Sequence, residues 1–191
     1  MLRVIPILFI LCACNLGSTQ PISESHYQWP RDLKYKLGDC LYFKANDTTY
    51  GCVVVCDFSK DSAGIWYAAF YSGYDSVVIP TLSSIKTGKV MGRKVESGID
   101  PKGYTRYLDG DLIHDSIFTN SKNFTLLGNM PLKDGIELGS YGIMTSMSDV
   151  KVSFKQRIEF RLKVPDHYTE HLKKLDNFHP EQYFRMSEFT K

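Results

Sequence analysis

Hydrophobic and polar residues alternate strictly over the stretch 150–164, with one interruption at Gln156. The apolar positions are Val150, Val152, Phe154, Ile158, Phe160, Leu162 and Val164. A period of two places every second side chain on the same face of a β-strand. The pattern therefore predicts an antiparallel strand, bent or bulged at Gln156, whose charged face lies in water.

Four shorter segments, rich in β-branched and aromatic residues, predict further strands. They cover residues 40–44, 50–58, 64–71 and 76–79. The polar residues 45–49 between the first two segments predict a hairpin turn. The stretch 86–103 holds four glycines, a proline and five lysine or arginine residues, which predicts a long loop.

The C-terminal part of the chain predicts short helices. Pro165 ends the predicted strand, and residues 166–176 have the spacing of a short amphipathic helix. The tail is aromatic, with Phe178, Tyr183, Phe184 and Phe189, and predicts a second short helix or an extended strap that docks on the sheet. The predicted fold is α+β and mostly β: a bent or partly closed antiparallel sheet with short C-terminal helices packed on it.

The N-terminus has the pattern of an export signal. Arg3 precedes an apolar stretch that ends in Leu11-Cys12-Ala13-Cys14 and is too short to span a bilayer. The pattern is typical of a bacterial lipoprotein, in which cleavage before Cys14 frees this residue for acylation. An ordinary cleaved signal peptide is the alternative. We expect a signal peptide over residues 1–13, a flexible tether over 14–33, and one β-rich domain over 34–191.

Composition narrows the possible partners and the thiol chemistry. The net charge of +2 is too small to attract the phosphate backbone of nucleic acid, so nucleic acid is not expected as a partner. Cys52 and Cys56 on one strand would have Cα atoms about 13 Å apart, beyond disulfide reach. Cys40 could face either of them across the hairpin, but the pattern favours three buried thiols that act as small hydrophobic residues.

Enzyme motifs are scarce. The chain has neither a G-x-S-x-G elbow nor a phosphate-binding glycine loop, so we expect no catalytic residues, no cofactor and no small-molecule substrate. His167, Glu170 and His171 spell the zinc motif H-x-x-E-H. A catalytic zinc needs a third ligand, and after the predicted helix only Glu181 and Glu188 follow as carboxylates. We therefore expect no metal, and place both histidines on the solvent side of a short helix; a zinc hydrolase is the alternative.

Aromatic residues crowd the stretch 66–75 and predict a binding surface. Alternation along the strand should bury about half of them and expose the rest. The candidate binding residues are Trp66, Tyr67, Tyr71, Tyr74 and the adjacent Asp75.

Residues 37–43 (Leu-Gly-Asp-Cys-Leu-Tyr-Phe), the polar turn and residues 50–55 (Tyr-Gly-Cys-Val-Val-Val) resemble the start of the immunity protein 26 family of bacterial polymorphic toxin systems. Residues 123–128 resemble its second landmark, with Phe124 where the family more often has Trp. The resemblance covers about residues 34–131 and implies a mostly β protein that neutralises a toxin. It adds Asp39 as a candidate binding residue. Gly38 and Asp39 also fit a structural turn.

We expect a toxin-neutralising immunity lipoprotein that acts by protein–protein binding and needs no active site. Its partner would be a toxin encoded by a neighbouring gene. Its lipid would hold it at the bacterial cell envelope, on the periplasmic or cell-surface side. The alternative is a non-enzymatic envelope lipoprotein that binds glycan, or another envelope component, through exposed aromatic rings.

Overall fold

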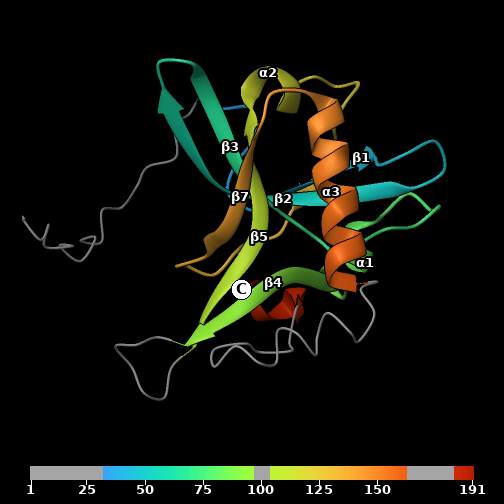
Figure 1. The fold of residues 1–191 in the computed structure, drawn as a ribbon, viewed down its shortest axis with the longest axis vertical. Coiled ribbons are helices and arrows are strands. Elements are labelled where there is room, and N and C mark those ends of the chain that lie inside the picture. The colour runs from blue at the N-terminus through green and yellow to red at the C-terminus, as the bar shows by residue number, and fades with distance from the viewer. Residues whose placement is uncertain (1–31, 97–103, 163–182) are drawn as a thin grey trace, which may run out of the picture.

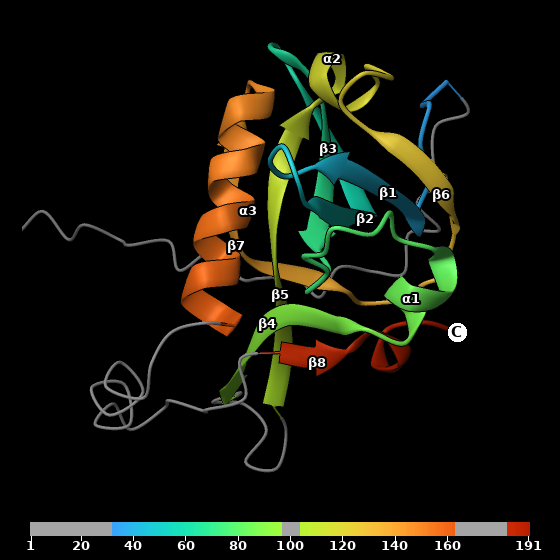
Figure 2. The ribbon, with the colours of Figure 1, turned by 90° about the vertical axis from the view of Figure 1, so that its right-hand side faces the viewer.

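A curled β-sheet forms the body of the protein in the computed structural model, which describes residues 32–96, 104–162 and 183–191 (Figure 1). The strands are β1 (Asp39–Lys44), β2 (Tyr50–Asp61), β3 (Gly64–Tyr71), β4 (Lys89–Glu96), β5 (Tyr104–His114), β6 (Thr125–Asn129), β7 (Glu137–Met144) and β8 (Tyr183–Arg185). Their order is β6-β1-β2-β3-β5-β4-β8, and β7 pairs with β5. All pairs are antiparallel except β5–β7. The predicted α+β, mostly β class with a bent sheet is confirmed (Figure 2).

The predicted β1–β2 hairpin is confirmed. The strands pair from Cys40 opposite Val54 to Lys44 opposite Tyr50. The Asn46 side-chain carbonyl accepts hydrogen bonds from the backbone N–H groups of residues 48 and 49, each at 2.8 Å. Asparagine favours such turns because its side chain can satisfy the backbone two or three residues further on.

Both faces of the central strands are covered. On β3, Tyr67, Ala69 and Tyr71 belong to one hydrophobic core, which also contains residues of helix α3 (Met147–Leu162) and helix α2 (Asp115–Phe118). Ala68 and Phe70 belong to a second core, on the other face, with residues of helix α1 (Leu82–Lys86), β8 and the 3-10 helix η1 (Met186–Glu188). A strand covered on both faces has no face for polar side chains.

The prediction of a strand over residues 150–164 is wrong, because α3 covers residues 150–162; residues 163 and 164 lie outside the described residues. Val150, Phe154 and Ile158 are buried and lie four residues apart, so they share one face of the helix, whereas Val152 is 51% exposed. Ser146 caps the helix: its Oγ accepts from the Asp149 N–H and donates to the Asp149 carboxylate. A spacing of four residues fits a strand face and a helix face equally well, so the apolar positions alone do not decide between them.

Two further predictions about strands need correction. The predicted loop 86–103 contains β4, which pairs with β5 and β8. The predicted strand 76–79 is instead a loop, in which Ser76 alone forms an isolated bridge with Tyr50. Pairing with distant strands decided both cases, because β4 pairs with β5 and β8, whereas residues 77–79 pair with no strand in the described part of the chain.

The C-terminal tail docks on the sheet as a strap, as predicted. β8 pairs with β4, and the rings of Phe184 and Phe189 pack edge to face at 5.5 Å. Leu33, which we assigned to the tether, is 7% exposed and packs in the first core, so the folded body begins before residue 34.

The predicted signal peptide with Cys14, the tether as far as residue 31, and the predicted helix 166–176 with its H-x-x-E-H motif lie outside the described residues. Among the residues that are described, none of the helices has the length and apolar character needed to cross a membrane.

Candidate functional site

Three of the predicted binding residues lie in or against the cores. Tyr67 and Tyr71 are 0% exposed and Trp66 is 8% exposed. The Trp66 indole N–H donates to Asp61 at 3.1 Å, and its ring packs edge to face on His114. The expectation that alternation exposes half of these rings is wrong, because β3 is covered on both faces. These rings are therefore not available as a contact surface.

Asp39 has a structural position. It is 8% exposed, and its carboxylate accepts from the Lys36 N–H at 2.9 Å and from the Asn129 side-chain amide at 2.8 Å. Gly38 has a φ of 85°, a conformation that side chains other than glycine rarely adopt. The Gly38-Asp39 pair therefore forms a turn and links β1 to β6, the structural alternative noted for it above.

Tyr74 and Asp75 lie in the loop between β3 and α1, which we call the β3–α1 loop (residues 72–81). This loop exposes three consecutive aliphatic side chains: Val77 at 69%, Val78 at 63% and Ile79 at 50%. A run of three exposed apolar residues carries a cost in solubility and marks an interaction site. Sequence reasoning missed this surface because Val and Ile predict a strand.

Hydrogen bonds hold the β3–α1 loop in place. The Tyr74 hydroxyl donates to the Val78 carbonyl at 2.8 Å, and the Val78 N–H donates to the Ser76 hydroxyl at 3.2 Å. The Tyr50 N–H donates to the Ser76 carbonyl at 2.8 Å, which fixes the loop to the start of β2. The exposed aliphatic residues thus belong to an ordered loop, so binding through them requires little additional ordering.

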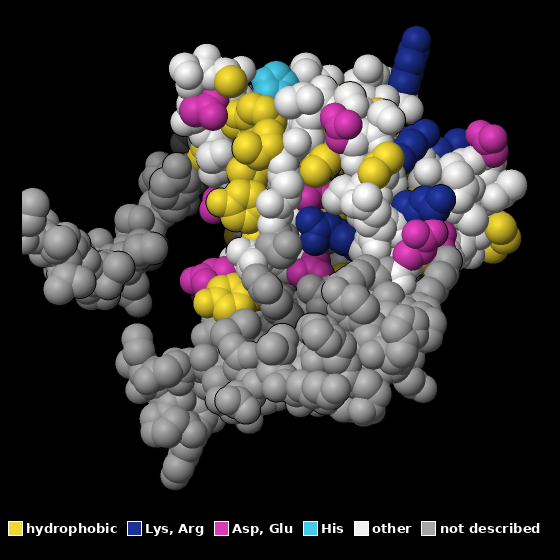
Figure 3. Space-filling model, in the orientation of Figure 1, with side chains coloured by type: hydrophobic (Ala, Val, Ile, Leu, Met, Phe, Trp, Pro, Cys, Tyr) yellow, Lys and Arg dark blue, Asp and Glu magenta, His cyan; other side chains and the backbone are white. Residues whose placement is uncertain are grey.

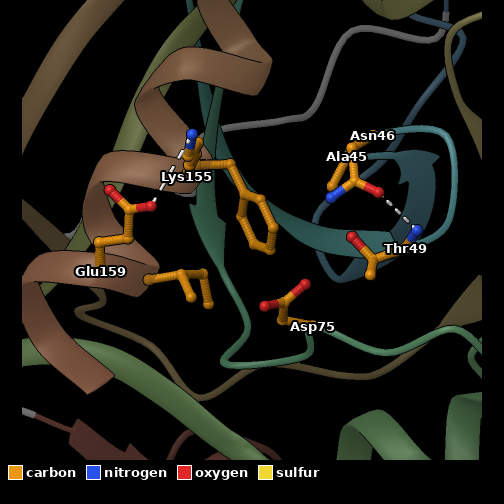
Figure 4. A pocket seen from close by; sticks show the side chains of 8 residues that line it. Ala45, Asn46, Thr49, Asp75, Lys155 and Glu159 are labelled. Carbon is orange, nitrogen blue, oxygen red and sulfur yellow. Dashed lines mark hydrogen bonds and ion pairs between the residues drawn. The ribbon is translucent and has the colours of Figure 1, made fainter. Parts of the chain in front are cut away.

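A small hollow adjoins this loop and includes Asp75 (Figure 4). Its volume is about 180 Å³, and the residues around it come from the β1–β2 turn, the β3–α1 loop and α3. They are Ala45, Asn46, Thr49, Asp75, Phe154, Lys155, Ile158 and Glu159. Small-molecule pockets usually measure roughly 300–1,000 Å³, whereas this space suits a single amino-acid side chain.

Charged and apolar side chains both line the hollow. Lys155 and Glu159 form an i,i+4 ion pair at 3.8 Å on the exposed side of α3. Two carboxylates, those of Asp75 and Glu159, and one ammonium group leave one net negative charge around the space. The Thr49 hydroxyl is buried at its edge and has no hydrogen-bond partner among the described residues. This arrangement suits a cationic, hydrogen-bonding side chain.

A buried polar cluster joins α3 to the sheet but does not form an accessible active site. The Asp111 carboxylate is 0% exposed and accepts four hydrogen bonds, from Tyr71 and Ser153 at 2.6 Å and from Arg157 and the Gly142 N–H at 2.8 Å. Burial, together with the adjacent negative charge of Asp111, raises the pKa of Tyr71 well above its usual value. The phenol therefore stays neutral and serves as a hydrogen-bond donor.

The three cysteines in the described residues are not exposed as nucleophiles either. Cys40, Cys52 and Cys56 are free and buried. Burial raises the pKa of Cys52 and Cys56, and the thiolate, not the thiol, is the reactive form. Within residues 32–96, 104–162 and 183–191, no three His, Cys, Asp or Glu residues are grouped so that they could hold a metal ion.

A second apolar surface lies on β7. Apolar side chains gather along this strand in Figure 3, and Tyr141 and Ile143 are 59% and 63% exposed. Within the described residues β7 pairs with β5 alone, so it forms an edge of the sheet. This surface contains none of the predicted binding residues.

The chain matches no family model, no curated protein and no solved structure.

Proposed function

We propose that this chain is an immunity lipoprotein that neutralises a protein toxin by binding it through the β3–α1 loop and the adjoining hollow. The observation that carries the proposal is the run Val77-Val78-Ile79, exposed on a loop that hydrogen bonds hold in one conformation. Fully burying one such side chain stabilises a complex by roughly 1.5–3 kcal/mol. Three adjacent ones form an apolar centre of the kind that dominates binding energy.

Charge favours a protein partner over a lipid surface. Asp75 and Glu159 lie around the hollow next to the loop, and the anionic headgroups of a bilayer would repel them. A lysine or arginine of a protein partner would fit the hollow and pair with these carboxylates. The partner surface is therefore apolar at its centre with a basic group beside it.

The shape of the apolar group favours protein binding over glycan binding. Sugar recognition commonly relies on an exposed aromatic ring that stacks on the apolar face of the sugar. Trp66, Tyr67 and Tyr71 are buried, and the β3–α1 loop exposes aliphatic groups. Aliphatic groups fill pockets on proteins but provide no stacking platform.

The two segments that carry the resemblance to the immunity protein 26 family are neighbours in space, which supports the proposal. β6 pairs with β1, with Gly128 opposite Cys40. Phe124 packs on Phe43 at 5.5 Å and on Phe118 at 4.8 Å, so an aromatic residue fills the position where the family more often has Trp. In a protein of this kind the scaffold presents a surface and needs no catalytic group.

The proposed lipid on Cys14 would contribute through local concentration. Anchoring an inhibitor at the envelope raises its local concentration at the surface that an incoming toxin must reach. Affinity for the toxin and anchoring are separable, because the anchor precedes the folded body in the chain. A Cys14→Ser variant should bind the toxin normally in solution and protect cells less well.

The test is co-expression of the full chain with each toxin encoded by a neighbouring gene, followed by measurement of cell survival and of the dissociation constant. Val78→Asp should weaken binding at least tenfold and abolish protection. Ile143→Asp is the matched control, because Ile143 has the same 63% exposure on β7, and it should bind as the wild type does.

Three outcomes would overturn the proposal. Loss of binding in Ile143→Asp together with normal binding in Val78→Asp would move the interface to β7. Failure of the wild type to bind or neutralise any of these toxins would reject the immunity function. Loop-dependent binding of the wild type to phospholipid vesicles, without a protein partner, would show that the loop contacts membranes instead.

A further inference from the structure

Cys40 on β1 and Cys52 on β2 bring their sulfur atoms to 3.2 Å from each other. The strand register places Cys40 opposite Val54 and Cys52 opposite Tyr42, so the two cysteines are diagonal neighbours on one face of the hairpin. Both are 0% exposed and belong to the same core. A disulfide has an S–S distance of about 2.0 Å, so the two sulfur atoms must approach by a further ~1.2 Å to bond.

The third thiol of the domain is directed elsewhere. The Cys56 thiol donates to the Ala68 carbonyl on β3 at 3.4 Å. β3 lies on the opposite side of β2 from β1, where Cys40 is located. The structure therefore selects one pairing from the two that the sequence allows for Cys40.

We infer that Cys40 and Cys52 form a disulfide that joins β1 to β2 when the chain folds in the presence of a disulfide donor, either a small molecule or a protein. The thiolate of one cysteine attacks the donor disulfide and forms a mixed disulfide, releasing one donor thiol. The thiolate of the second cysteine then attacks the sulfur of the first and releases the other donor thiol. The cysteine pair loses two electrons and two protons, and the donor gains them.

The bond forms before the core closes. Cys40 and Cys52 are 0% exposed in the folded chain, so a disulfide donor cannot reach them, and burial, and next the neighbouring Cys40 thiol, raise the pKa of Cys52. The same burial then shields the finished disulfide from reductants. The bond encloses the β1–β2 turn, which carries Asn46 and Thr49 at the hollow, but the inference does not depend on the proposed function.

The experiment refolds the denatured full chain with oxidised and reduced glutathione. Remaining thiols are then blocked with N-ethylmaleimide in denaturant, and the chain is digested with trypsin without reduction. Cleavage after Lys36, Lys44 and Lys60 yields one peptide with Cys40 and another with Cys52 and Cys56. We expect mass spectrometry to find the two peptides joined through Cys40 and Cys52, with Cys56 carrying the maleimide.

Variants locate the bond. Cys56→Ser is the control and should retain the joined peptides, whereas Cys52→Ser should lose them. Dithiothreitol should lower the unfolding midpoint of the wild type and of Cys56→Ser while leaving Cys52→Ser unchanged. Maleimide on both Cys40 and Cys52 of the refolded wild type would overturn the inference without any variant, and so would a bond from Cys40 to Cys56 or to either cysteine of the N-terminal segment.

Discussion

Arg157 on α3 donates a hydrogen bond to the Asp111 carboxylate on β5 at 2.8 Å and another, of equal length, to the adjacent Gly110 carbonyl. The side chain of Asp111 is 0% exposed and that of Arg157 is 15% exposed, so the pair is almost excluded from water. The pair fixes α3 to the sheet. Because α3 also carries Lys155 and Glu159, the pair sets where those side chains border the hollow (Figure 4).

Removing the cation of this pair should destabilise the fold strongly. Arg157→Met leaves the Asp111 carboxylate buried without its counter-ion, and such a change costs about 3–5 kcal/mol. Lys155→Met is the matched control: its side chain is 75% exposed, and its ion pair contributes at most about 0.5 kcal/mol. Urea unfolding followed by circular dichroism measures both changes. Equal stabilities of the two variants would contradict a structural role for the buried pair.

A double variant separates charge burial from packing. Asp111→Asn combined with Arg157→Met removes both charges, and it should recover part of the stability lost in Arg157→Met alone. Partial recovery is expected because the neutral amide is less costly to bury than an unpaired carboxylate. A double variant less stable than Arg157→Met would show that the hydrogen bonds to the Asp111 carboxylate from Tyr71, Ser153 and the Gly142 N–H outweigh the cost of its buried charge.

A helix over residues 147–162 predicts different stability costs for two substitutions than a strand would. Phe154 is 2% exposed and packs on Phe43 and Tyr71, so Phe154→Ala should cost about 3–5 kcal/mol. Val152 is 51% exposed, so Val152→Ala should change stability by less than about 0.5 kcal/mol. In an alternating strand both residues would be buried on one face. Comparable losses in the two variants, measured by urea unfolding, would favour the strand.

The turn before β1 should not accept a side chain at Gly38. A Cβ on Gly38, at a φ of 85°, would overlap the Met130 carbonyl. Gly135 also has a positive φ, of 75°, but has no atom within 4 Å of such a Cβ. Gly135→Ala should therefore cost about 1–2 kcal/mol from backbone strain, and Gly38→Ala should cost more than about 3 kcal/mol. Thermal unfolding compares the two, and equal costs would rule out the steric contribution.

Acid should weaken the β2–β3 turn through Asp61. Hydrogen bonds from the Trp66 indole and from the Ala63 N–H lower the pKa of Asp61 below its usual 3.8. A folded-state pKa below the unfolded value gives stabilisation that is complete above the unfolded pKa and is lost as pH falls through the folded pKa. Asp61→Asn retains a carbonyl acceptor for Trp66 and removes only the charge.

Unfolding measured between about pH 6 and pH 2 tests this titration. The stability advantage of the wild type over Asp61→Asn should shrink as pH falls. NMR titration should give Asp61 a lower pKa in the folded protein than in an unfolded peptide covering residues 58–66. Identical values in the two would show that these hydrogen bonds do not act on the charge.

Local chemistry in the sequence determined the β1–β2 hairpin and β3. The hairpin follows from the Asn46 turn between two segments of high strand propensity, and Gly38 marks a position that needs a positive φ. These features depend on residues a few positions apart, so they can be predicted without knowledge of the fold. The class, α+β and mostly β, follows from them.

The tertiary structure alone decided that residues 147–162 form a helix, that Tyr67 and Tyr71 are buried, and that Val77-Val78-Ile79 are exposed. Apolar residues four apart satisfy either a helix or a strand, and the surface they meet selects one. Whether a side chain is covered depends on segments far away in the chain. α3 and α2 cover one face of β3, whereas no described strand extends the sheet over residues 77–79. The sequence shows which residues are apolar. Only the packing of distant elements determines which of these side chains stay exposed and can contact a partner.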